Sequence, residues 1–423
     1  MKIDLAYGKK GLIIEVPENQ TTVIEPIYLP GLPDVNGSLV NAIRNPVGSL
    51  PLRQSVKPND SVAISVCDIT RPMPSSTVLP VLLKELGHVN RENISILVAT
   101  GTHRSNNREE LVNMLGEDVV NSYRVINHSA FKQDELTYVG VTSTDIPIWM
   151  NKTWMQSDVR ITTGFVEPHF FAGFSGGPKM VAPGLAGFKT IMGLHSASLI
   201  SNQNSTWAIT EGNPIHDQIR EIAVKTGVTF SIDVTINRDH QITSCYAGDL
   251  LKVHRAACDG ARRNAMRSVP QLYDIVITTN SGFPLDMNLY QAVKGMSAAS
   301  LVAKDGGAII CAAECSDGIP EHGEYGNMLM SRDTPGELLE MIHAWTDGHH
   351  DQWQVQIQSQ LLMKNQIYLK SSYLTNDQVR SAHLKPVTDI QHTLNHLVNV
   401  KGGKDCTICV LPLGPQTIPF LKI

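Results

Sequence analysis

The sequence predicts an α/β fold of two doubly wound, Rossmann-like domains whose sheets are rich in parallel strands. Short runs rich in valine and isoleucine recur along the chain, as expected for strands that are buried on both faces. Helical patterns lie between these runs, and such alternation is typical of parallel sheets covered by helices. A chain of 423 residues is also too long for one ordinary hydrophobic core, so two domains are expected.

The predicted strands are apolar runs, each followed by turn residues. They lie at residues 61–68, 94–100, 159–164, 229–236, 273–279, 307–313 and 406–413. The N-terminal residues 1–16 predict a strand, a turn and a second strand.

The predicted helices lie between these strands, at residues 75–87, 107–116, 213–227, 249–266 and 288–302. The ends of the helix at 213–227 are marked most clearly. Asn213 is a good N-cap, Pro214 suits the first helical position, and Gly227 ends the helix.

A domain boundary is expected at residues 267–271, where a long helix ends at a proline before a new strand. This divides the chain into domains of residues 1–268 and 269–423. Ligands of open α/β sheets bind beyond the carboxyl ends of the strands. With two such domains, the active site is expected in the cleft between them.

Charge and hydropathy exclude several functional classes. The net charge is −5 and no basic run is present, which argues against a nucleic-acid partner. No apolar run reaches the length of a membrane span, and residues 1–16 lack the pattern of a signal peptide. We therefore expect a cytoplasmic protein without a membrane partner.

The seven cysteines do not form a disulfide framework, because their number is odd and their spacing is irregular. Cys406 and Cys409 form a C-x-x-C motif, which could indicate a metal or redox site. They lie in a predicted strand, however, where residues three apart point to opposite faces. A structural role is the favoured interpretation.

Mostly polar residues follow four predicted strands. They are Asp68, Thr70, Arg71, Gly101, Thr102, His103, Arg104, Glu167, His169, Asn280, Asp286, Gln291 and Lys294. Each has a structural alternative when taken singly: Asp68 and Thr70 could form an Asx-type turn, and His169 could pack against Phe170 and Phe171. Their occurrence together at four strand ends favours a binding or catalytic site with two imidazoles.

Residues 162–195 contain an unusual density of glycines together with Lys179 and His195. Glycine weakens regular elements, so this density indicates backbone that approaches another group closely. The GGPK segment at 176–179 lacks the spacing of a phosphate-binding P-loop, which excludes a classical ATPase. His195 is an isolated candidate metal ligand, so other ligands would have to come from outside the protein.

Five separated motifs resemble those of the nickel-dependent lactate racemase family, in the family's order. They lie at residues 65–75, 97–104, 167–195, 282–296 and 351–357, with a weaker match at 45–49. The resemblance covers nearly the whole chain and its motifs are highly specific.

The resemblance implies a racemase or epimerase that inverts the C2 centre of a 2-hydroxy-carboxylate by reversible hydride transfer. The cofactor would be the nickel-pincer nucleotide, tethered to Lys179, with nickel bound by His195. His103 and His169 would be the paired acid–base catalysts. The remaining implied site residues bind cofactor (Asp68, Ile69, Thr70 and Arg71) or substrate (Arg71, Tyr290, Gln291, Lys294 and Trp353).

The first domain would then bind the cofactor, and the second would contribute substrate-binding residues. Cofactor-biosynthesis enzymes are the implied partners, a homo-oligomer is one candidate assembly, and protein purified without those enzymes could lack the cofactor. Such a cofactor performs the difficult chemistry while the protein orients it. Two alternatives stay open: a non-racemizing metal-dependent hydrolyase, and a nucleotide-binding protein on the same fold.

The sequence departs from the family pattern at two positions. Pro178 stands where lactate racemases carry arginine, and Thr102 stands where they carry phenylalanine. The candidate substrates are therefore lactate, malate, a longer 2-hydroxy acid or a sugar acid. A more polar pocket wall favours one of the longer acids.

Overall fold

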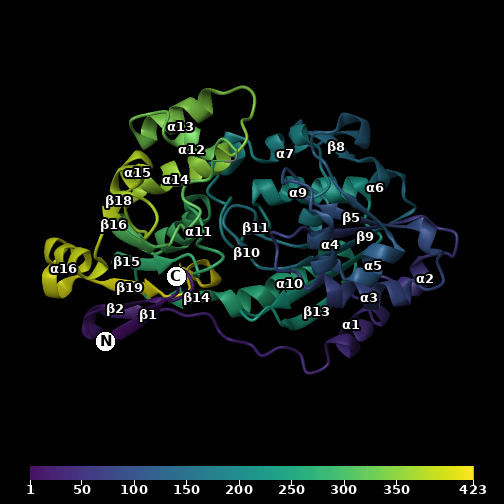
Figure 1. Ribbon diagram of the computed structural model, residues 1–423, viewed down its shortest axis with the longest axis horizontal. Helices are drawn as coiled ribbons and strands as arrows, with labels where there is room; N and C mark the ends of the chain where they lie inside the picture. The colour runs from purple at the N-terminus through teal and green to yellow at the C-terminus, as the bar shows by residue number, and fades with distance from the viewer. Residues whose placement is uncertain (322, 423) are drawn as a thin grey trace. The chain divides into compact units, whose positions relative to one another are not determined.

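The computed structural model describes residues 1–321 and 323–422, and it confirms an α/β fold with two parallel-rich sheets. The chain divides into two compact units (Figure 1). Unit 1 comprises residues 1–27, 196–201 and 265–423, and unit 2 comprises residues 28–195 and 202–264.

Unit 2 is built on a six-stranded sheet in the order β13-β12-β9-β4-β5-β6. The five parallel strands are β4 (Val62–Cys67), β5 (Ile94–Ala99), β6 (Arg124–Asn127), β9 (Val159–Phe165) and β12 (Phe230–Ile236). The edge strand β13 (Ile242–Gly248) pairs antiparallel with β12. Strand order reverses between β4 and β9, and this reversal is the position where doubly wound sheets bind ligands.

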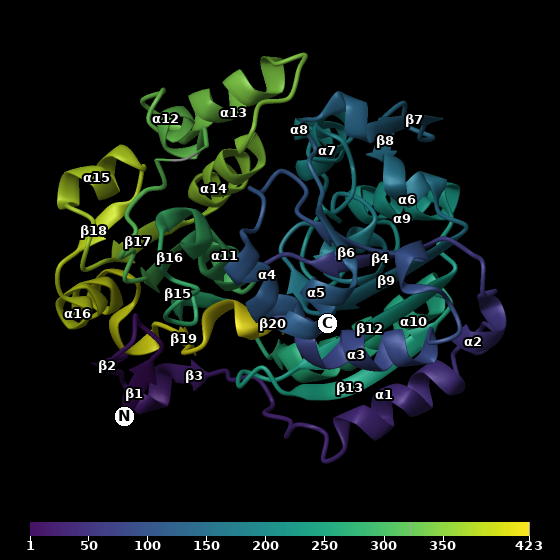
Figure 2. The same cartoon turned by 45° about the vertical axis from the view of Figure 1, so that its right-hand side comes forward.

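Helices and two hairpins surround this sheet. The helices are α1 (Val35–Arg44), α2 (Leu52–Ser55), α3 (Ser75–Glu85), α4 (Arg108–Leu115), α5 (Glu117–Ser122), α6 (Lys152–Gln156), α7 (Phe188–Leu194), α9 (Pro214–Thr226) and α10 (Leu250–Ala265). The hairpins are β7 (Leu136–Val141) with β8 (Pro147–Asn151), and β10 (Pro168–His169) with β11 (Gly173–Phe174). Helices α1 and α3 lie side by side (Figure 2), and their apolar side chains join those of β4 and β5 in one core.

Unit 1 is built on a six-stranded parallel sheet in the order β18-β17-β16-β15-β19-β3. Its strands are β3 (Thr21–Val23), β15 (Tyr273–Thr279), β16 (Ala303–Ala312), β17 (Gln366–Lys370), β18 (Lys385–Val387) and β19 (Ile408–Leu411). Two further pairs are the hairpin of β1 (Lys2–Leu5) with β2 (Leu12–Glu15), and β14 (Met266–Val269) with β20 (Ile418–Leu421). The N-terminal hairpin predicted from residues 1–16 is confirmed.

The helices of unit 1 pack on both faces of its sheet. They are α8 (Ala197–Ile200), α11 (Leu289–Ser300), α12 (Tyr325–Leu329), α13 (Pro335–Ala344), α14 (Gln352–Lys364), α15 (Asn376–Ser381) and α16 (Ile390–Val400). Cys409 belongs to the core cluster on one face of the sheet and Cys406 to the cluster on the other face. The structural interpretation of the C-x-x-C motif is therefore confirmed.

The two units differ from the expected domains in three segments, one of which is residues 265–268 at the start of the last segment of unit 1. Residues 1–27 and 196–201 belong to unit 1, whereas the sequence analysis placed them in a domain of residues 1–268. The physical reason at the N-terminus is strand pairing, because β3 pairs in parallel with β19. The side chains of Ile3, Leu5 and Ile14 also pack with Ile275 and Ile408 in one core cluster.

No helix among the residues that the structure describes is both long enough and apolar enough to cross a membrane.

Candidate active site

An aspartate–histidine pair lies at the carboxyl ends of β4 and β5. Asp68 follows β4 and His103 lies in the loop after β5. The His103 Nδ1 and the Asp68 Oδ2 are 2.7 Å apart, and the side chain of Asp68 is 4% exposed whereas that of His103 is 50% exposed. The imidazole of His103 is therefore open to solvent on one side and held on the other side by the buried carboxylate of Asp68.

The charge state of Asp68 fixes the tautomer of His103. Burial alone would raise the pKa of Asp68, but the hydrogen bonds from His103 and Thr70 and the nearby charge of Arg71 outweigh burial, so the pKa is lowered. The ionised carboxylate can only accept, so His103 Nδ1–H donates to it. Neutral His103 then carries a lone pair on Nε2, the form required of a general base.

The loop of residues 68–71 has both a turn and an exposed face. The hydroxyl of Thr70 donates to Asp68 Oδ1 at 2.7 Å, and the backbone N–H of Arg71 donates to the carbonyl of Asp68 at 3.1 Å. Ile69 is 40% exposed. The hydroxyl contact and the backbone turn together hold Asp68 toward His103, but they are not the Asx-type turn considered from the sequence, in which a backbone N–H two residues on donates to the aspartate side chain.

A second cluster surrounds the ring of Phe171, which is 6% exposed between β10 and β11. The ring centroids of Phe171 and His169 are 4.5 Å apart, and those of Phe171 and His195 are 5.4 Å apart. Lys179 Nζ lies 6.0 Å from the centre of the same ring. One aromatic side chain thus contacts the three groups that the sequence analysis singled out in residues 162–195.

Two glycines with positive φ angles form the turn that leads into Lys179. Gly176 has a φ of +71° and Gly177 has a φ of +48°. A Cβ on Gly177 would lie 2.5 Å from the ring of His254, so a larger residue would displace the turn. The backbone N–H of Gly177 donates to Asp233 Oδ1 at 3.0 Å, and Lys179 follows in a short 3-10 helix, half-buried.

His195 is oriented as metal-binding histidines usually are. It lies at the carboxyl end of α7 and is 8% exposed. Its Nδ1 is 2.8 Å from the carbonyl oxygen of Ile191, which can only accept, so Nδ1 carries the proton. The lone pair therefore resides on Nε2, and a backbone acceptor of this kind is a common second partner of a metal ligand.

Backbone and side-chain contacts tie the two clusters to each other within unit 2. The N–H of Gly101, two residues before His103, donates to the carbonyl of Gly184 at 3.0 Å. Ser65 Oγ donates to the carbonyl of Met180 at 2.7 Å. The sulfur of Cys67, the residue before Asp68, lies 3.6 Å from that of Met180.

Four of the five predicted substrate-binding residues lie on two packed helices of unit 1, whereas Arg71 belongs to unit 2. On α11, Lys294 Nζ donates to Gln291 Oε1 at 2.6 Å. Trp353 on α14 donates from Nε1 to the hydroxyl of Tyr290 at 3.1 Å. The four residues therefore form two hydrogen-bonded pairs inside one unit. That they share a substrate with the groups of unit 2 stays a prediction.

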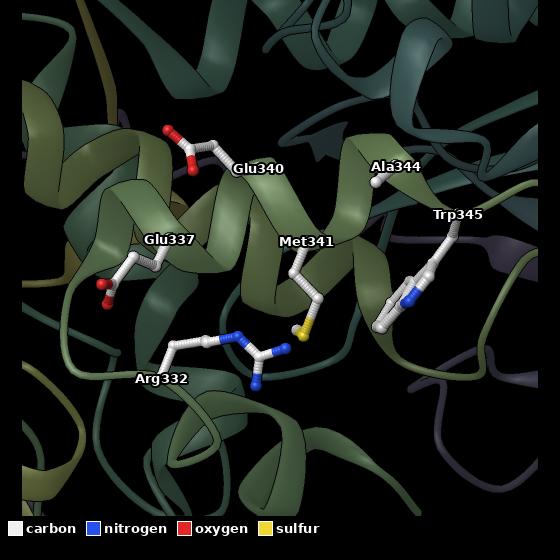
Figure 3. Close-up of a pocket in the computed structure, with 6 residues that line it drawn as sticks. All are labelled: Arg332, Glu337, Glu340, Met341, Ala344 and Trp345. Carbon is white, nitrogen blue, oxygen red and sulfur yellow. The ribbon is translucent and has the colours of Figure 1, made fainter.

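A surface hollow beside α13 contains neither the site residues of unit 2 nor the predicted substrate-binding residues of unit 1 (Figure 3). It is lined by Arg332, Glu337, Glu340, Met341, Ala344 and Trp345. None of these is a predicted site residue. Among the described residues, no group of three or more histidine, cysteine, aspartate or glutamate side chains could hold a metal ion.

Comparisons with known families match both halves of the chain. The family model described as lactate racemase N-terminal domain matches residues 7–208, and the model described as lactate racemase C-terminal domain matches residues 269–418. The chain belongs to the lactate racemase family. Family membership makes it a racemase- or epimerase-type isomerase by descent and confirms the resemblance carried by the five motifs.

Two curated members of the lactate racemase family are similar over nearly their full length. The lactate racemase of Thermoanaerobacterium thermosaccharolyticum is 32% identical over 98% of this chain and 98% of its own. That of Lactiplantibacillus plantarum is 33% identical over 97% of this chain and 98% of its own.

Solved structures support the same fold. The lactate racemase apoprotein from T. thermosaccharolyticum superposes with a TM-score of 0.93 and 31% identity, covering 99% of this chain and 100% of that one. A Thermotoga maritima protein shows the fold alone, with a TM-score of 0.69 and 18% identity over 93% of this chain and all of its own.

Sequence reasoning missed a buried layer beneath the glycine-rich segment. Asp233, His254 and His216 contact the backbone at Gly177, Ser175 and Ala172 respectively. Asn213 was predicted only as a helix cap, yet it also contacts Phe171. These residues occur in ordinary strand and helix patterns, so only the three-dimensional contacts reveal them.

Proposed function

We propose that this protein inverts the C2 centre of a 2-hydroxy-carboxylate with the nickel-pincer nucleotide attached to Lys179. One observation carries the proposal: in a chain of this family, Lys179, His169 and His195 all lie around the ring of Phe171.

The residues of unit 2 fit that cofactor. His195 Nε2 would bind the nickel, because its Nδ1 proton is already donated to Ile191. If His195 binds the nickel, the family resemblance implies that the organic part of the cofactor would supply the other ligands. Lys179 would supply the amine of the tether, and the exposed face of residues 69–71 would contact the nucleotide.

The chemistry divides between cofactor and protein. The C2 hydrogen of a hydroxy acid is a very weak acid beside an anionic carboxylate, so its removal as a proton is unfavourable. When bound, the nickel-pincer nucleotide supplies an acceptor that takes this hydrogen with its electron pair and returns it to either face. The protein must then accept and return the hydroxyl proton and hold the carboxylate.

In this proposal, His103 accepts the hydroxyl proton. Its Nε2 lone pair takes the proton as the C–H electron pair leaves C2, which gives the planar 2-oxo acid. The Asp68 carboxylate at Nδ1 stabilises the resulting imidazolium. On the opposite face, the imidazolium of His169 would donate a proton to the C2 oxygen as the hydrogen returns, and it would become a neutral imidazole. Arg71 or Lys294 would hold the substrate carboxylate, Arg71 with two parallel hydrogen bonds.

The decisive experiment is intact-mass measurement of protein produced together with the cofactor-biosynthesis enzymes. We expect a covalent adduct in the parent protein and its loss in Lys179→Ala. Lys189→Ala is the matched control, because Lys189 is an exposed lysine on the nearby helix α7. Absence of an adduct from the parent would favour the hydrolyase or nucleotide-binding alternative, and an adduct retained in Lys179→Ala would refute the tether.

The two histidines are tested by assaying racemisation from each enantiomer. His103→Ala and His169→Ala should each abolish interconversion in both directions, because both side chains act in every complete cycle. Retention of substantial activity by either variant would contradict the two-histidine mechanism.

A further inference from the structure

The two histidines differ in which ring nitrogen is hydrogen-bonded to the protein and in the partner at that nitrogen. His103 Nδ1 donates to the carboxylate of Asp68. His169 Nδ1 instead accepts, because the backbone N–H of Ala172 points to it at an N···N distance of 3.2 Å. An N–H group has no lone pair to offer, so Nδ1 must be unprotonated and the proton of neutral His169 resides on Nε2.

The peptide that makes this contact is held from its other side. The N–H of Ala172 and the carbonyl of Phe171 belong to the same peptide group. Asn213 Nδ2 donates to that carbonyl at 2.8 Å. A hydrogen bond to the oxygen of a peptide polarises it and strengthens the bond donated by its N–H. Asn213, Phe171, Ala172 and His169 therefore form one chain of hydrogen bonds.

The orientation of the Asn213 amide is determined by its contacts. The side chain is fully buried. Its Oδ1 accepts from the N–H groups of Ile215 and His216 at the start of α9, at 3.0 and 3.2 Å. Its Nδ2 donates to the carbonyls of Phe171 and Ile209. If the amide were inverted, Nδ2 would face two N–H donors and Oδ1 would face two carbonyl oxygens. Only the observed orientation satisfies all four contacts.

We propose that Asn213 is a positioning residue that fixes His169 in the Nε2–H tautomer through the Phe171–Ala172 peptide. The resting protein then holds two unlike histidines: His103 Nε2 has a lone pair and can accept a proton, whereas His169 Nε2 already carries a hydrogen and cannot accept one. The tautomer follows from the contacts alone, whereas its catalytic consequence rests on the proposed function. In that function, the resting state is prepared for the enantiomer whose hydroxyl faces His103.

The test reads the tautomer directly, in the unloaded protein labelled with 15N-histidine. The 15N chemical shifts distinguish a protonated ring nitrogen from one with a lone pair, and His169→Gln assigns the signals. In the parent protein we expect a protonated Nε2 and an unprotonated Nδ1 at residue 169. A protonated Nδ1 in the parent would overturn the proposal without any further variant.

Asn213→Asp separates positioning from helix capping. Aspartate keeps the oxygen that caps α9 and removes both donors of Nδ2. We expect the single tautomer of His169 to become a mixture of both tautomers. A folded Asn213→Asp protein with the unchanged Nε2–H tautomer would overturn the role of Asn213. If that variant does not fold, Asn213→Ser, which also keeps a capping oxygen, provides the same comparison.

A matched control is present elsewhere in unit 2. Asn151 caps α6 through its Oδ1, and its Nδ2 lies 3.2 Å from Nδ1 of the buried His128. Asn151→Asp is therefore the same substitution at the same kind of cap beside a different histidine. It should change the signals of His128 and leave those of His169 unchanged. An equal change at His169 in both variants would mean that the effect is general destabilisation and would overturn the proposal.

The tautomer measurement is independent of catalysis. An inactive, adduct-free protein that shows the expected tautomers would contradict the proposed function and leave the role of Asn213 intact. Normal racemisation together with a protonated Nδ1 at His169 would contradict the role of Asn213 and leave the proposed function intact.

Discussion

Asp233 should make the stability of this protein depend on pH in an unusual direction. The side chain is fully buried in β12 and accepts one hydrogen bond, from the N–H of Gly177. Its second oxygen has no hydrogen-bond partner among the described residues. Burial raises the pKa of Asp233 from 3.8 to about 7, against the opposing effect of the Gly177 N–H. The folded state therefore favours the protonated carboxyl.

The sign and the magnitude follow from this shift. Because the folded-state pKa is raised, the stabilising contribution is complete below pH 4 and is lost as pH rises toward 7. Each unit of pH between about 4 and about 7 costs about 1.4 kcal/mol. Of the range from pH 5 to pH 8, only the part below about pH 7 lies in this window, so the loss of stability is about 3 kcal/mol. The neighbouring thiols of Cys67 and Cys258 stay neutral there, because burial raises their pKa values.

The perturbation is Asp233→Asn, which keeps the acceptor for Gly177 and is neutral at every pH. The assay is urea unfolding of parent and variant at pH 5, 6, 7 and 8. Subtracting the two free energies of unfolding removes the contribution of shared groups such as His254. We expect the parent to lose about 3 kcal/mol relative to the variant across this range. Asp134→Asn, at an exposed carboxyl, is the control. A difference that does not change with pH would refute the reasoning.

Three further predictions concern the site and the core. Asp68→Asn should lower kcat at least 100-fold in both directions with little change in KM, since His103 loses the acceptor that fixes its tautomer; a change in KM alone would contradict this role. In a comparison of rates, the polar Thr102 and the lost cation at Pro178 should favour malate, 2-hydroxyglutarate or a sugar acid over lactate, and a clear preference for lactate would refute this. Phe230→Ala, at the fully buried first residue of β12, should cost about 3–5 kcal/mol in urea unfolding.

The sequence predicted seven strands of the two large sheets because their signals are local, and it did not predict β3, β6, β13, β17 or β18. The run at 62–67 is apolar at nearly every position, which is the pattern of a strand buried on both faces, and β4 is buried throughout. The cap Asn213 and the stop Gly227 also marked both ends of α9 correctly. Each of these signals depends only on neighbours in the chain.

Features that depend on long-range contacts were not predictable in this way. Helix α14 buries glutamines at four alternate positions, 352, 354, 356 and 358, and such polar residues carry no apolar periodicity. The contact of Asn213 with Phe171 joins residues 42 positions apart. Likewise, nothing in the local pattern around Phe171 indicates that its ring contacts both Lys179 and His195.

The pairing of β3 with β19 has a consequence for how this chain is made. Residues 21–23 are synthesised long before their partner strand at 408–411. The core cluster that holds Ile3, Leu5 and Ile14 therefore lacks Ile408 until that strand has been synthesised. Closing a loop of this length is entropically costly and slows folding. The sheet of unit 1 is thus expected to be completed only after residues 408–411 have been synthesised, and the apolar side chains that wait for this strand are a natural substrate for chaperones.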